Sequence, residues 1–70
     1  MSIKDKEIII CDYHQQGAEY AARMRLDRKD VLIFTRPEQI MAHEFDSCVM
    51  LTNDLNLRRL TQTRMGRKAS

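Results

Sequence analysis

The sequence predicts a small α/β domain: a three-stranded parallel sheet with helices, in the order strand, helix, strand, helix, strand, helix. Its three short apolar runs lack the polar–apolar alternation of half-exposed strands, which is typical of parallel strands buried on both faces. Segments of helical character separate the runs by short links, as in right-handed crossover units. We therefore expect a Rossmann-like half, folded as one domain over residues 1–66, with a basic, disordered tail at 67–70.

The first strand is expected at Glu7–Asp12, where three isoleucines follow one another. The helix expected at His14–Leu26 places Gly17 and several alanines on one face. Side chains this small allow a helix to lie close to a sheet. Asp12 precedes the expected helix start, where an acidic side chain is favourable.

The second strand is expected at Val31–Thr35 and the second helix at Pro37–His43. Between them, Thr35 and Glu38 have the spacing of a capping box, with proline near the first helical position. This pattern predicts that the Thr35 side chain caps the helix.

The third strand is expected at Ser47–Leu51. Thr52-Asn53-Asp54 then supplies capping side chains for a last helix from Leu55 to Met65. Gly66 is a natural helix stop.

The length and the cysteines exclude several classes of protein. Seventy residues allow one domain of marginal stability. Cys11 and Cys48 lie inside apolar runs and outside any CxxC pair, so we expect reduced thiols and neither a disulfide nor a structural zinc site. The apolar run near the N-terminus is too short for a signal peptide or a membrane span. We expect a cytoplasmic protein with no cofactor and no membrane partner.

Charge is distributed unevenly along the chain. Residues 1–54 carry seven basic and ten acidic side chains, whereas residues 55–70 carry five basic and no acidic ones. The five candidates for binding nucleic acid or an acidic partner are Arg58, Arg59, Arg64, Arg67 and Lys68. The alternative is a surface helix whose last turn suits its own dipole. Few aromatic residues and no helix-turn-helix pattern argue against sequence-specific DNA recognition.

The carboxyl ends of the expected strands bring three polar loops to one edge, where ligands of open parallel sheets bind. The candidate ligand-binding residues at this edge are Asp12, His14, Arg36, Asn53 and Asp54. Asp12 and Asp54 could hold Mg²⁺, or they could serve only as helix caps; we expect capping and no metal. The first strand-to-helix turn has one glycine and no lysine, which argues against a phosphate loop. Neither cysteine has a histidine placed to activate it.

The segment TRPEQIMAHEFDSCVMLTND resembles the part of phage terminase or helicase motor domains that leads into their acidic nucleotide-site strand. Phe45-Asp46 match the phrase that precedes this strand in those motors, whereas Thr52-Asn53-Asp54 replace their Asp-Glu. The resemblance covers about 20 residues. It implies a degenerate P-loop scaffold without its phosphate loop or ATPase chemistry, encoded by a phage, in which Asp54 alone could be carried over.

These observations together predict a non-enzymatic binding or accessory protein that acts through its surface and its basic C-terminal helix. The alternatives are a nucleic-acid-binding module and a Mg²⁺- or nucleotide-binding protein that uses the strand-end loops. A three-stranded parallel sheet has two open edges, so we also expect a homo-oligomer, most simply a dimer. The apolar residues expected to lack intrachain partners are Met24, Met41, Phe45, Met50 and Leu57.

Overall fold

The computed structural model describes residues 6–45 and 47–66, which form one three-stranded parallel sheet. The strands are β1 (Glu7–Ile10), β2 (Val31–Phe34) and β3 (Val49–Met50). Their order across the sheet is β2-β1-β3, so that β1 is central and pairs in parallel with both neighbours. The expected α/β fold with a parallel sheet is confirmed.

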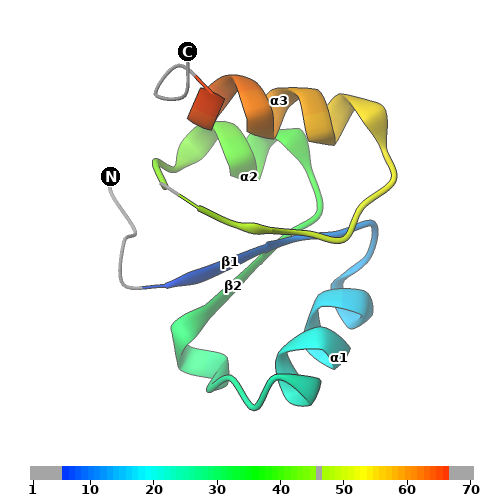
Figure 1. The fold of residues 1–70 in the computed structure, drawn as a ribbon, viewed down its shortest axis with the longest axis vertical. Coiled ribbons are helices and arrows are strands. Elements are labelled where there is room, and N and C mark those ends of the chain that lie inside the picture. Colours follow the sequence, from blue (N-terminus) through cyan, green and yellow to red (C-terminus); the bar gives the residue numbers. More distant parts are fainter. Residues whose placement is uncertain (1–5, 46, 67–70) are drawn as a thin grey trace.

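Helices cover both faces of the sheet (Figure 1). One face carries α1 (His14–Arg23), and the other carries α2 (Pro37–Ala42) and α3 (Leu55–Gly66). A single 3-10 turn, η1 (Arg28–Asp30), leads into β2. The expected Rossmann-like strand order is not confirmed, because a Rossmann half has the order 3-2-1 whereas this sheet has the order 2-1-3, with which flavodoxin-like sheets begin.

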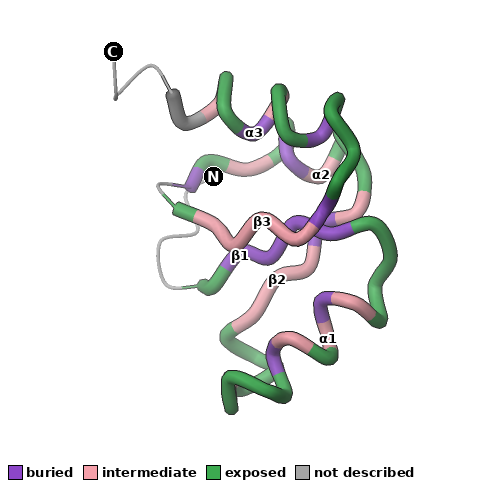
Figure 2. Tube along the Cα trace, turned by 45° about the vertical axis from the view of Figure 1, so that its right-hand side comes forward, coloured by how far each residue is buried: buried purple, intermediate pink, exposed green. Residues whose placement is uncertain are grey.

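The central strand β1 is buried on both faces, which explains why its sequence does not alternate (Figure 2). Ile8 and Ile10 belong to the core under α2 and α3. Ile9 and Cys11 belong to the core under α1. All four side chains are at most 1% exposed. The three consecutive isoleucines therefore supply both layers of the core.

Aromatic residues complete the core under α2 and α3. The Phe34 ring lies edge-on to the Phe45 ring, with a centroid separation of 6.0 Å, and stacks on the His43 ring at 5.2 Å. Ile40 of α2 and Leu57 of α3 close this core. The expectation that Phe45 and Leu57 lack intrachain partners is therefore wrong, since both are buried.

The three methionines that are also expected to lack intrachain partners lie in different surroundings. Met24 and Met41 are exposed by 54% and 61%. Met50 is partly buried against the core under α2 and α3. Only the first two therefore lie on the surface, as expected.

The start of α2 differs from the predicted capping box by one residue. Pro37 is the first helical residue, but the N-cap is Arg36 instead of Thr35. The Gln39 side chain folds back, and its Oε1 accepts hydrogen bonds from the backbone N–H groups of Thr35 (2.8 Å) and Arg36 (3.1 Å). A glutamine at the third helical position thus satisfies the Thr35 backbone donor, which the Glu38 side chain is expected to satisfy in the predicted capping box, and also the donor of Arg36.

The other elements lie where the sequence predicts them, but their bounds differ. The observed strands are shorter than predicted, most of all β3, and the first two helices end at Arg23 and Ala42 instead of Leu26 and His43. The predicted α3 differs by one residue at its end. The predicted tail at 67–70 lies outside the described residues. Within the described part of the chain, no helix has the length and apolar character needed to cross a bilayer.

Gly17 allows α1 to lie against the sheet, as its small-residue face predicted. A Cβ atom built on this buried glycine would lie 2.8 Å from Ile33 Cγ2 and 3.1 Å from Cys11 Sγ. Both distances are too short for ordinary van der Waals contact. The glycine is therefore needed for close packing, although it is unfavourable in a helix interior.

Gly17→Ala is expected to destabilise the protein even though alanine is the better helix former. Overpacking of a core costs about 1–3 kcal/mol, which exceeds the gain of about 1 kcal/mol in helix propensity. Thermal unfolding should show a lower melting midpoint for this variant. Gln15→Ala, at an exposed position of the same helix, is the control and should change stability by less than about 0.5 kcal/mol. A raised midpoint for Gly17→Ala would contradict the close packing.

Candidate functional site

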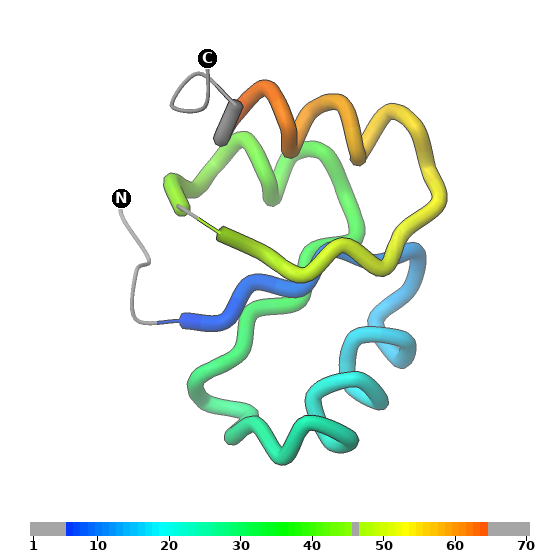
Figure 3. Tube along the Cα trace, in the orientation of Figure 1, coloured from blue at the N-terminus to red at the C-terminus, as the bar shows by residue number. Residues whose placement is uncertain are grey.

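The carboxyl edge of the sheet contains a point where the chain leaves in opposite directions (Figure 3). After β1 the chain enters α1 on one face, and after β3 it enters α3 on the other. These two strands are neighbours, so the loops that follow them diverge. In open α/β sheets such a switch point is the usual location of a ligand site.

Hydrogen bonds join the two diverging loops. The Thr52 hydroxyl donates to Asp12 Oδ1, and Thr52 Oγ1 also accepts from the backbone N–H of Asp54 at 3.0 Å. Thr52 is completely buried. The Gln16 side chain adds two bonds, since its Oε1 accepts from the Asp12 backbone N–H at 2.8 Å and its Nε2 donates to the Leu51 carbonyl at 3.4 Å. Side chains of the protein itself therefore connect the two sides of the switch point.

The two acidic candidates have different roles. Asp54 Oδ1 accepts from the backbone N–H groups of Asn56 (2.8 Å) and Leu57 (3.4 Å), so it caps α3 as predicted. The predicted capping role of Asp12 is wrong, because the N-cap of α1 is Tyr13, which makes no side-chain capping bond. Asp12 instead accepts from Thr52.

A metal at this edge would compete with the bonds that both carboxylates already make. Among the described residues, no group of three or more histidine, cysteine or acidic side chains is arranged to hold a metal ion. The hydrogen bonds at this edge therefore link the loop after β1 to the loop after β3. Each of the two carboxylates already has a partner within the protein.

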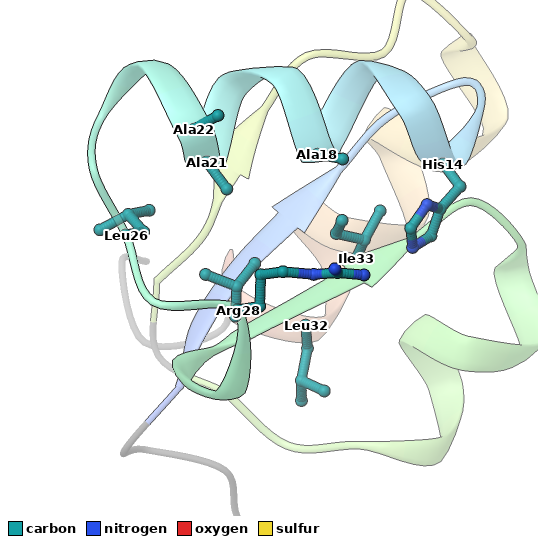
Figure 4. Close-up of a pocket in the computed structure, with 9 residues that line it drawn as sticks. His14, Ala18, Ala21, Ala22, Leu26, Arg28, Leu32 and Ile33 are labelled. Carbon is teal, nitrogen blue, oxygen red and sulfur yellow. The ribbon is translucent and has the colours of Figure 1, made fainter.

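The other candidates at the carboxyl edge do not join this network. His14 begins α1 and lines a groove between α1 and β2 (Figure 4). Arg36 is exposed at the start of α2, and Asn53 is exposed before α3. The structure thus brings together Asp12 and Asp54, through Thr52, and not the full predicted set.

Sequence reasoning overlooked Gln16 as a functional residue and treated Thr52 only as part of a capping segment. The signal for Gln16 was its position four residues after Asp12, within the first helical turn, where a side-chain amide can fold back onto free backbone groups. The Asp12–Thr52 bond joins residues 40 positions apart, and no local sequence pattern predicts such a pair.

The basic candidates are distributed along α3. Arg58 Nη1 donates to the Thr52 carbonyl at 3.2 Å, and Arg64 Nη2 donates to the His43 carbonyl at 2.8 Å. Arg59 is exposed. Arg67 and Lys68 lie outside the described residues.

The two cysteines lie on opposite faces of the sheet and are free thiols. Cys11 is buried under α1, where its Sγ donates to the Tyr13 carbonyl at 3.2 Å, and Cys48 is partly buried on the other face. Burial raises the pKa of both thiols above the ordinary value. A raised pKa disfavours the thiolate, so neither cysteine is suited to act as a nucleophile at neutral pH.

Comparisons with known proteins identify no relative: no family model, curated protein or solved structure matches this chain.

Thr52→Val should destabilise the protein by about 1–2 kcal/mol, because it removes the hydroxyl shared by Asp12 and Asp54 while keeping the side-chain volume. Chemical denaturation measures this loss. Thr63→Val is the matched control, since its hydroxyl is exposed and bonds only within α3, to the Arg59 carbonyl. The control should change stability by less than about 0.5 kcal/mol. Equal effects of the two substitutions would refute a special role for Thr52.

The cysteines predict a loss of stability in mildly alkaline solution. The pKa values of both thiols are raised in the folded state. Their full contribution to the free energy of unfolding is therefore present below about pH 8.5, and it is lost as the pH rises through the folded-state pKa values. Denaturation series between about pH 8 and 9.5 should show this decline. The slope should be shallower in Cys48→Ala, and an unchanged slope would contradict the contribution of that thiol.

Proposed function

We propose that this chain is a non-enzymatic binding domain that contacts an acidic protein partner through the outward face of α3. The observation that carries the proposal is the charge of this helix. Residues 55–64 contain three arginines and no acidic side chain, whereas the remainder of the chain up to Asp54 is acidic overall. A basic helix on an otherwise acidic domain favours a partner whose surface is acidic.

Packing determines which face of α3 is available. Leu57 and Thr61 are buried, and Leu60 packs against the core under α2 and α3. The exposed side chains of the helix include Arg58, Arg59, Gln62 and Thr63. The adjacent Arg58 and Arg59 therefore lie one helical turn before Gln62 and Thr63 on the exposed side of α3.

The hydrogen bonds of two arginines support a binding role. Arg58 and Arg64 each use one guanidinium N–H group to bind a backbone carbonyl of a neighbouring loop. A guanidinium has five N–H donors in a rigid fork, so most of them stay available after this contact. An arginine held in this way loses less conformational freedom when it binds a carboxylate, which favours association.

An acidic protein surface suits this helix better than a nucleic acid does. The guanidinium fork matches carboxylates and phosphates alike in a two-point contact, so the distinction comes from the other side chains of the helix. Proteins that bind single-stranded nucleic acid usually add aromatic side chains on which bases stack. The described part of α3 contains no aromatic residue.

The proposal predicts that removal of two charges from α3 abolishes partner capture. Tagged protein should retain an acidic protein from cell lysate with or without nuclease, and Arg58→Gln/Arg59→Gln should lose it. Arg23→Gln/Arg25→Gln removes the same charge from exposed positions in and just after α1 and should retain the partner. Melting midpoints establish that both variants fold.

Two results of this experiment would contradict the proposal. Loss of the captured material after nuclease treatment would favour the nucleic-acid-binding alternative. Equal capture by the two double variants would show that α3 is not the contact surface.

A further inference from the structure

The outer edge of β2 offers one residue whose backbone is free to pair. Parallel strands direct the backbone groups of alternate residues to alternate sides. The Cys11 N–H donates to the Phe34 carbonyl, so Phe34 and Leu32 face β1, whereas Val31 and Ile33 face outward. The Val31 N–H donates to the Arg28 carbonyl of η1. Among the described residues, no hydrogen bond reaches the N–H or C=O of Ile33.

An apolar groove of about 450 Å³ runs beside this edge (Figure 4). One wall is the small-residue face of α1, and the other is β2. Val31 and Ile33 lie on the α1 side of β2, line the groove and stay partly exposed, although the isoleucines of β1 are fully buried. Open backbone groups beside incompletely covered apolar side chains are the features of an edge that accepts another strand.

The charges at the two ends of β2 identify the strand that fits. In an antiparallel pair centred on Ile33 and its copy, residues equally far before and after Ile33 lie opposite one another. Directly outside the paired stretch these residues are Asp30, which ends η1, and Arg36, the extended N-cap of α2. The two have opposite charges, and both side chains are exposed. This pair occurs twice in a twofold arrangement.

We propose that two copies of this chain pair through β2, antiparallel and related by a twofold axis at Ile33, to form one six-stranded sheet. The two Ile33 residues exchange their backbone N–H···O bonds, and the second copy's β2 covers the groove. The axis is perpendicular to the sheet, so the two α3 helices lie on the same face, away from both α1 helices. This inference does not depend on the proposed function.

Charge exchange tests both the dimer and its register. Light scattering after size exclusion should give the mass of two chains for the unchanged protein at micromolar concentration. Asp30→Arg and Arg36→Asp each replace two attractive contacts with repulsive ones and should raise the dimer Kd about tenfold or more. An equimolar mixture of these two variants should regain the two-chain mass, because every facing pair in the mixed dimer has opposite charges.

The controls are Glu19→Arg and Arg23→Asp, which make the same changes of charge at exposed positions of α1. Neither should alter the dimer Kd, and melting midpoints should show that all variants fold. A single-chain mass for the unchanged protein would overturn the proposal. If neither Asp30→Arg nor Arg36→Asp raised the dimer Kd, or if the control substitutions raised it equally, the proposed β2 register would be wrong.

Discussion

The burial of β1 on both faces and along both edges determines the arrangement of every other element. Three consecutive isoleucines and a cysteine supply apolar side chains to both sides of the sheet, so helices must cover both sides. β1 also provides the register for each neighbouring strand. The two helical layers pack differently on this strand. On one face α1 approaches closely through Gly17, and on the other face α2 and α3 enclose larger aromatic side chains.

The sequence predicts the helices and strands well where the signal is local. Ile8–Ile10 identify a buried strand, Pro37 identifies a helix start, and Gly66 identifies a helix end. The misplaced cap of α2 shows the limit of such signals. Thr35 and Glu38 have the correct spacing for a capping box, but Gln39, one residue later, makes the bonds in the folded chain.

Features that join distant parts of the chain are not predictable in this way. The order β2-β1-β3 requires the chain to cross β1 on its way from β2 to β3, and no residue pattern encodes that reversal. The sequence predicts the candidate site only in part. It places the strand-end acids at one edge of the sheet, but the partner of Asp12 is the buried Thr52, which becomes a neighbour only after this strand order forms.

The short β3 has a consequence for the order in which the domain assembles. β3 pairs with β1 over two residues, whereas β2 pairs over four, and β2 is also nearer to β1 in sequence. Closing the shorter loop costs less chain entropy, so we expect the β1-α1-β2 unit to form first and the segment with β3 and α3 to dock later. We also expect the later segment to separate at a lower free energy in native-state fluctuations. Any partner held by α3 therefore acts as a folding ligand, which shifts the docking equilibrium of the half that carries it.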